Sequence, residues 1–194
     1  MLIAILYFIS SIASASKETV DSLYDNGKFN QAYLLAQELV LINDRAAQRV
    51  IGLTMLDMIE KGTNDKQFSR TLTPLIEGTA IDKAQYWLKK SSNQGDINSM
   101  VALGELYAYY AEKKDYELAY HYFRKAHEAN SARGTYHLGL FYLKQLGVKR
   151  DLKKAFKLFK LASEQGDFES MRLIGDFFHY GYLDEIDSHG YKNE

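Results

Sequence analysis

Four small residues recur in one register along the chain, and they constrain its architecture more than any other feature. Each repeat alanine is followed eleven residues later by Asn or Gly, and nine residues after that by Gly. The sets are Ala32–Asn43–Gly52, Ala84–Gly95–Gly104, Ala119–Asn130–Gly139 and Ala155–Gly166–Gly175. The later alanines are 35 and 36 residues apart, a period typical of helical repeat arrays. One such unit cannot bury its apolar face alone, so we expect stacked helix pairs.

The composition excludes several classes of protein. The 194 residues suit one domain or a short solenoid. With 24 basic and 25 acidic residues the net charge is −1, whereas a nucleic-acid-binding protein needs a basic surplus. The absence of cysteine excludes disulfides and thiolate metal sites. A single proline leaves the helices almost uninterrupted.

The N-terminal segment resembles a secretory signal peptide. Residues 1–15 carry no charged side chain, residues 2–9 are an unbroken apolar run, and Ala13-Ser14-Ala15 fits the small-x-small cleavage pattern. The run is shorter than the about 20 residues that span a bilayer. We therefore expect a cleaved signal peptide at 1–15 and a periplasmic or secreted mature protein without a membrane span. A buried N-terminal helix or an uncleaved anchor is the alternative, because no basic residue precedes the apolar run.

The repeat glycines predict close helix–helix contacts. A glycine inside a helix costs about 1 kcal/mol relative to alanine, so its return in every unit indicates a packing reason. The residues five positions before these glycines are also small and fit the same crossing: Ala47, Ser99, Gly134 and Ser170. In the stretch from Ser99 to Asn130, the residues Ser99, Leu103, Leu106, Tyr107 and Tyr110 form the predicted packing stripe of one helix.

Capping residues predict where the helices end. Gly and Asn adopt the left-handed conformation most readily, so Asn43, Gly95, Asn130 and Gly166 suit helix C-termini. Asp115 and Asp151 stand four residues before their repeat alanines, where an N-cap belongs. We expect helices at 17–26 and 29–42, then three further pairs of which the last is incomplete, with only a first helix at 171–180. The solenoid is expected to cover 16–181, followed by a polar tail at 182–194. About 60–81 is an insertion, either a loop on a functional face or tolerated extra length.

The motifs of the later units resemble a known family. Leu138-Gly-Leu-Phe-Tyr142, Gly147-Val-Lys-Arg-Asp151, Phe159, Ala162 and Gly166 look like one full Sel-one-like repeat, a relative of the tetratricopeptide repeat. Leu103-Gly-Glu-Leu-Tyr107 with Ala119 and Ala126 resembles a second copy, and Ile174-Gly-Asp-Phe-Phe178 begins another. The match is specific over about 82–181, whereas the first helix pair keeps only the register.

The resemblance implies an all-α fold, a right-handed α-α superhelix (solenoid) of about four tandem helix pairs that binds other proteins. Many members are exported bacterial proteins, among them host-interaction factors, envelope adaptors and immunity proteins for secreted antibacterial effectors. Some cysteine-rich members are linked to penicillin binding, but this chain has no cysteine.

A partner-binding groove is expected on the first helices of the pairs, opposite their packing stripes. Apolar and aromatic side chains with isolated charges suit such a surface. The alternative is that a curved solenoid buries part of this face itself. The candidate groove residues are Arg49, Leu53, Glu105, Tyr109, Tyr136, Leu140, Leu143, Arg172, Asp176 and His179.

The sequence predicts no catalytic, cofactor or metal site. It contains no His-Glu-x-x-His, nucleophile elbow or phosphate-binding glycine loop. We expect a non-enzymatic, exported protein-binding repeat protein, with a periplasmic immunity protein that blocks a secreted effector as the sharper hypothesis. An envelope adaptor or host-interaction factor is the alternative, and a β-lactam or cell-wall hydrolase is the less favoured one.

Overall fold

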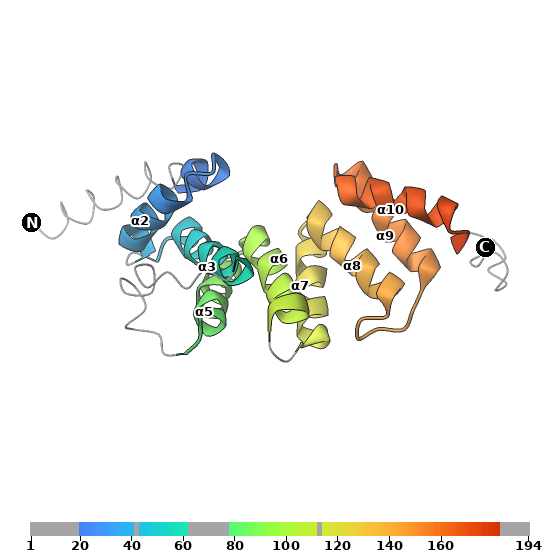
Figure 1. Cartoon of the computed structure of the whole chain (residues 1–194), viewed down its shortest axis with the longest axis horizontal. Coiled ribbons are helices and arrows are strands. Elements are labelled where there is room, and N and C mark those ends of the chain that lie inside the picture. Colours follow the sequence, from blue (N-terminus) through green and yellow to red (C-terminus); the bar gives the residue numbers. More distant parts are fainter. Residues whose placement is uncertain (1–19, 41–42, 62–77, 112–113, 183–194) are drawn as a thin grey trace, which may run out of the picture. The chain divides into compact units, whose positions relative to one another are not determined.

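The computed structural model describes residues 20–40, 43–61, 78–111 and 114–182, and throughout these residues the chain is helical without strands (Figure 1). The predicted all-α class is confirmed. The chain separates into two compact units, Met1–Leu106 and Tyr107–Glu194. The predicted signal peptide, most of the insertion and almost all of the predicted tail lie outside the described residues.

The first unit contains two stacked layers of helix pairs. A helical turn at 20–25 precedes α2 (Phe29–Leu39). Next come α3 (Arg45–Glu60), α5 (Ala80–Asn93) and α6 (Ile97–Glu105). Helix α3 packs against α2, α5 and α6, so it is the centre of this unit. Its buried face includes Ala47, Val50, Ile51 and Met55.

The second unit repeats the same arrangement. Its helices are α7 (Tyr116–Glu128), α8 (Ala132–Lys144), α9 (Leu152–Glu164) and α10 (Phe168–His179). Helix α8 packs between α7 and α9, and α10 packs on α9. Four fully buried phenylalanines fill the spaces between these helices: Phe123, Phe141, Phe159 and Phe177. Helix α10 begins three residues earlier than predicted, because Asp167 caps it.

The helix predicted to run through Tyr110 changes its winding near the boundary of the units. Residues Leu106–Tyr110 form a π-helix, labelled η3. A π turn shifts the register relative to the 3.6-residue period, so periodicity does not predict which of its side chains are buried. Ala108 is buried within it, whereas Tyr109 is exposed.

The turns between helix pairs share one local structure. The predicted C-terminal residues all have positive φ: Asn43 61°, Gly95 81°, Asn130 64° and Gly166 95°. The following residue is in each case the N-cap of the next helix and accepts a backbone N–H bond: Asp44 2.8 Å, Asp96 2.8 Å, Ser131 3.2 Å and Asp167 2.7 Å. The predicted N-caps Asp115 and Asp151 are also confirmed. One left-handed residue followed by one capping residue thus reverses the chain between stacked pairs.

The predicted close approach holds at three glycines. A Cβ added to Gly52 would lie 2.6 Å from Leu88 Cγ, and one on Gly139 would lie 2.5 Å from Phe159 Cε1. A Cβ on Gly134 would lie 2.7 Å from Ala126 Cβ. Gly175 differs, because no described atom lies within 4 Å of its Cβ position. The packing explanation is therefore wrong for Gly175 within the described residues.

Candidate functional site

The groove residues predicted in the first unit are largely covered by other residues of that unit. The Arg49 side chain is only 11% exposed, and Leu53 and Glu105 are half-buried. The fold thus covers most of the Arg49 side chain, as the alternative of a partly self-buried face expects.

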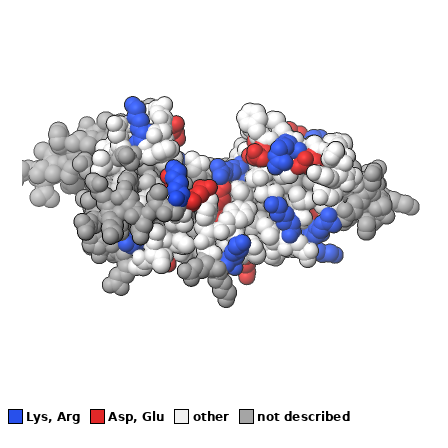
Figure 2. All heavy atoms as spheres, viewed as in Figure 1, with Lys and Arg blue, Asp and Glu red and all other residues white. Residues whose placement is uncertain are grey.

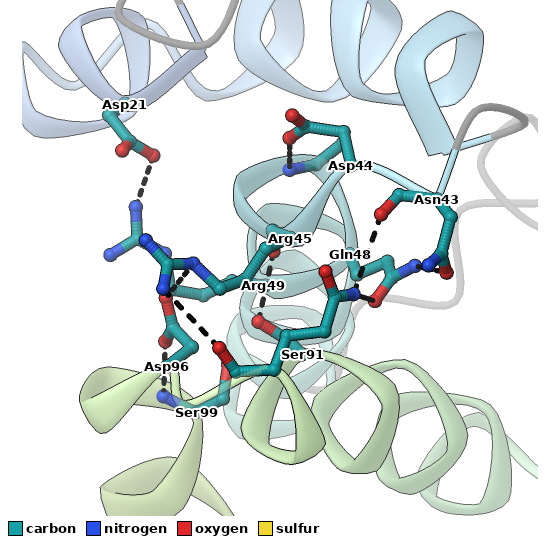
Figure 3. Close-up of polar contacts among 11 residues, drawn as sticks. Asp21, Asn43, Asp44, Arg45, Gln48, Arg49, Ser91, Asp96 and Ser99 are labelled. Carbon is teal, nitrogen blue, oxygen red and sulfur yellow. Dashed lines mark hydrogen bonds and ion pairs between the residues drawn. The ribbon is translucent and has the colours of Figure 1, made fainter.

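Arg49 joins three segments of the first unit through ion pairs (Figure 3). Its guanidinium pairs with Asp21 from the helical turn at 20–25, and its Nε lies 3.8 Å from Asp96 Oδ2 at the start of α6. Arg45 approaches the same Asp96 oxygen at 4.0 Å. Because Asp96 also caps α6, its carboxylate fixes both the end of a helix and the position of α3.

A buried amide network continues this polar cluster toward α5 (Figure 3). Gln48 is fully buried, donates to Asn43 Oδ1 at 2.7 Å and accepts from Gln94 Nε2 at 2.8 Å. Ser91 Oγ donates to the backbone oxygen of Arg45 at 2.9 Å. These bonds connect the turn at Asn43 to the end of α5. The ion pairs of this cluster join two arginines to two aspartates, so these four charges serve to hold the helices of the first unit together.

Most of this cluster was not predicted from the sequence, although the polar side chain of Gln48 at a repeat position was an indication of it. Gln48 stands four residues before its repeat glycine, where the later units carry Met100, Thr135 and Met171. A glutamine has to find hydrogen-bond partners when it is buried. Their identity depends on residues more than 40 positions away, which no local pattern reveals.

In the second unit, the predicted residues of α8 and α10 lie together at the surface. Arg172 is 61% exposed and bonds Glu169 at 3.1 Å and Asp176 at 3.0 Å along its own helix. Figure 2 shows this compact group of basic and acidic side chains over α10. The Glu169 hydrogen bond is the main cause that raises the pKa of Arg172. The guanidinium is thus charged and held by two carboxylates in an exposed position.

Tyr136 extends from α8 toward these α10 charges. Burial is the largest cause that raises its pKa, followed by the negative charges of Glu169 and Asp167. Its ring centroid lies 6.2 Å from that of Phe159, so one edge packs on the core while the side chain stays half-buried. Tyr136 is therefore a firmly placed aromatic group beside an oriented arginine.

Tyr109 adds a second aromatic group to this unit. It is 42% exposed, and its hydroxyl lies 3.5 Å from His137 Nδ1. The His137 ring is buried and stacks on Phe123 with centroids 4.3 Å apart. Our groove prediction did not include His137, which connects Tyr109 to the core and lies beside Tyr136 with ring centroids 5.0 Å apart.

Two predicted leucines of α8 belong to the interior rather than to an open groove. Leu140 is 6% exposed and is part of the core cluster with Phe159 and Phe177, so its predicted place at the groove surface is incorrect. Leu143 is half-buried and packs against the same cluster. The physical reason is that α8 has helices on both sides, which widens its buried face beyond one stripe. Asp176 is half-buried, and His179 is exposed at the end of α10.

The remaining predicted residues of the second unit define one candidate site, the tyrosine–arginine surface. It consists of Tyr109, Tyr136, Arg172, Asp176 and His179. Among the described residues, no three His, Asp or Glu side chains form a group able to hold a metal ion. In the same part of the chain, no helix is long and apolar enough to cross a membrane. The surface offers aromatic area and hydrogen-bonding charges, which suit contact with another macromolecule.

Helix pairs that repeat in one register, and that are joined by turns with one residue in the left-handed conformation, define an α-solenoid repeat protein. The Sel1 repeat family matches residues 80–96, 97–131 and 132–167. Residues 80–167 of this chain therefore carry Sel1 repeats, as the motifs around Gly104 and Gly139 indicate.

Three individual proteins are similar to this chain over different lengths. A crystal structure of a Sel1 repeat protein from Oxalobacter formigenes is 26% identical, has a TM-score of 0.59, and covers 84% of this chain and 61% of that one. Cysteine rich protein B of Helicobacter pylori is 22% identical with a TM-score of 0.48, over 75% of this chain and 94% of that one. The ERAD-associated E3 ubiquitin-protein ligase component HRD3B of Arabidopsis thaliana is 39% identical over 75 residues, 38% of this chain and 11% of that protein. The chain thus spans only a small part of this plant relative.

Proposed function

We propose that this Sel1-repeat protein binds another protein through the tyrosine–arginine surface of its second unit. The observation that carries the proposal is the placement of Arg172, an exposed guanidinium held by Glu169 and Asp176 beside the half-buried ring of Tyr136. Tyrosine and arginine dominate the binding energy of many protein interfaces. A side chain that is already oriented loses less conformational entropy when a partner binds.

A narrower proposal concerns the partner and the compartment. The uncharged residues 1–15 with their small-x-small ending support export, and the family resemblance supports an immunity protein that binds and blocks a secreted antibacterial effector in the periplasm. The mixed charges of the surface favour a partner with both acidic and basic groups over nucleic acid, in keeping with the net charge of −1.

Affinity capture tests the narrower proposal. Residues 16–194 serve as bait in bacterial envelope extract, and bound proteins are identified by mass spectrometry. One stoichiometric partner that is a secreted toxic enzyme, inhibited on binding, is the expected result. Capture of an envelope complex indicates the adaptor alternative instead. Intact-mass analysis of the exported protein tests cleavage, with Ser16 as the expected first residue.

Substitutions in the surface test the site itself. Tyr109→Ala and Arg172→Ala should each weaken binding of the captured partner about tenfold or more, since hot-spot truncations cost about 2 kcal/mol. Lys160→Ala is the matched control, because Lys160 is an exposed charged residue of α9 that is not part of this surface. The Tyr109→Ala and Arg172→Ala variants should keep the wild-type circular dichroism spectrum. Unchanged affinity in folded Tyr109→Ala and Arg172→Ala proteins would exclude this surface, whatever the partner.

A further inference from the structure

Positive charge is concentrated in one segment of the second unit, from the end of α8 through most of α9. Residues 144–160 contain seven basic residues and one acidic residue, Asp151, and so have a net charge of +6. The whole chain has a net charge of −1, so the other residues together carry −7. Figure 2 shows basic side chains grouped over the region that α8 and α9 occupy in Figure 1. A charge distribution as uneven as this orients a protein toward a partner of opposite charge.

Helix α9 presents its share of this charge on one exposed face. Its three exposed lysines are spaced by three residues, and the opposite face packs against α8 and α10 and buries Phe159. Glu164 is the only acidic residue of the helix. Two more basic residues are exposed in the turn that precedes α9. We call these five residues the basic surface: Lys149, Arg150, Lys154, Lys157 and Lys160.

Exposed apolar side chains adjoin the basic surface. Leu161 is 39% exposed on α9 itself. On α10, Phe178 is 64% exposed, and its ring centroid lies 6.2 Å from that of Phe156 on α9. Lys160 stands one helical turn after Phe156, so it lies on the side of α9 that faces α10. The surface thus combines a row of cations with apolar groups at its edge.

The residue types of the basic surface distinguish between anionic partners. Four of its five cations are lysines, whereas protein interfaces are depleted in lysine and enriched in arginine and aromatic residues. Single-stranded nucleic acid stacks its bases on aromatic rings, and the basic surface contains none. A phosphate group binds well at a helix N-terminus, but in α9 the Asp151 carboxylate already accepts the Lys154 backbone N–H there, at 2.8 Å. These observations disfavour both a protein and a nucleic acid.

We propose that the basic surface binds the headgroups of an anionic lipid membrane. A lysine ammonium is a point charge on a flexible stem, so it needs no fixed acceptor geometry and adapts to headgroups that diffuse. Clusters of about four to eight basic residues attract anionic lipids, and each residue raises the affinity about fivefold. The adjoining side chains of Leu161 and Phe178 suit the boundary between headgroups and acyl chains. Binding is peripheral, reversible and dependent on salt.

Co-sedimentation with lipid vesicles measures this binding. Residues 16–194 are mixed with vesicles of phosphatidylcholine alone, or of phosphatidylcholine and anionic phosphatidylglycerol in equal parts. We expect binding to the anionic vesicles only, and its loss at about 1 M salt, where the Debye length falls to about 3 Å. A protein that does not bind the anionic vesicles at low salt, or that binds both kinds equally, would overturn the proposal.

Charge removal locates the binding surface. The double variant Lys157→Gln/Lys160→Gln should bind anionic vesicles at least tenfold more weakly, because it loses two contributions of about fivefold each. The matched control is Lys28→Gln/Lys90→Gln, which removes the same charge from two exposed lysines of the first unit and should bind like the wild type. Both double variants should keep the circular dichroism spectrum. An equal loss of binding in the two would show that net charge alone matters, and the proposed surface would be wrong.

Competition separates a lipid surface from other polyanions. Duplex DNA and polyglutamate carry negative charge without an apolar layer, so neither should displace the protein from anionic vesicles when present at the same concentration of charge. Displacement by DNA would identify a nucleic-acid surface, and displacement by polyglutamate would identify a surface for an acidic protein segment. Either result contradicts the choice of a membrane.

The basic surface and the tyrosine–arginine surface share no residue, so their tests are independent. Lys157→Gln/Lys160→Gln should still bind the captured protein partner, and Arg172→Ala should still bind anionic vesicles. Loss of vesicle binding in folded Arg172→Ala would assign the lipid contact to the tyrosine–arginine surface and contradict the proposal.

Discussion

Gly139 of α8 lies directly against the ring of Phe159 on α9, and a Cβ on this glycine would lie 2.5 Å from Phe159 Cε1. The ring has little freedom to move, since Phe159 is fully buried and its centroid lies 5.9 Å from that of Phe177. The absence of one methyl group thus allows α8 and α9 to approach each other, which explains why the repeat tolerates a helical glycine.

Gly139→Ala and Gly175→Ala should have opposite effects on stability. The first inserts a methyl group into the Phe159 contact and should lower the free energy of unfolding by about 1–3 kcal/mol. The second meets open space in the middle of α10 and should raise it by up to about 1 kcal/mol, through helix propensity. Urea denaturation of dilute protein measures both values. Equal effects of the two substitutions would contradict the close-packing explanation.

Arg49→Met should destabilise the first unit. It leaves Asp21 and Asp96 without their shared cation in a partly buried place, at an expected cost of about 1–3 kcal/mol. Arg172→Ala is the matched control, because this arginine also pairs with two carboxylates but is exposed to solvent, where ion pairs contribute little. Chemical denaturation should show a lower midpoint of unfolding for Arg49→Met than for the wild type. The midpoint for Arg172→Ala should be almost the same as that of the wild type. A reversed order would mean that burial does not distinguish the two networks.

Two buried serines should respond differently to removal of the hydroxyl group. Ser170 Oγ is buried without a hydrogen-bond partner in the described part of the chain, so Ser170→Ala should leave stability unchanged or slightly higher. Ser91 Oγ donates to the backbone oxygen of Arg45, so Ser91→Ala should cost about 1 kcal/mol. Differential scanning calorimetry compares the two melting temperatures. A marked loss of stability in Ser170→Ala would reveal a hydrogen bond to this hydroxyl.

Tyr120 should make stability depend on pH in the alkaline range. Burial and the 2.8 Å hydrogen bond with Tyr142 raise the pKa of Tyr120 from 10.0 to about 12. A raised pKa means that the fold favours the neutral phenol. Its contribution is therefore complete below pH 10 and is lost as the pH rises from 10 to about 12.

Absorbance titration of tyrosinate measures this pKa by the difference between wild type and Tyr120→Phe. In Tyr142→Phe the pKa of Tyr120 should fall toward 10.0 but stay above it, because burial is the larger cause. An unchanged pKa in Tyr142→Phe would show that the hydroxyl pair has no part in the shift.

Much of the fold was predictable from local residue patterns. The φ angles of Asn43 and Asn130, and the caps at Asp115 and Asp151, agree with the sequence because helix ends depend on residues within a few positions. The repeat register predicted the contacts of Gly52 and Gly139, since each pair of helices packs like the others. The caps after each left-handed residue were equally local, yet we did not infer them.

The sequence by itself determined the repeat register, many of the helix ends and the presence of Sel1 repeats, because these rest on short-range backbone preferences and on apolar periodicity. Only the tertiary structure decided which surface positions are available. Arg49 is mostly buried and forms ion pairs with Asp21 and Asp96, and Leu140 is buried between neighbouring helices. Arg172, in contrast, is exposed to solvent, and no described atom lies near the Cβ position of Gly175. Exposure depends on which helices cover a residue from elsewhere in the chain. Periodicity along one helix shows the direction of a side chain but not how many neighbours surround that helix.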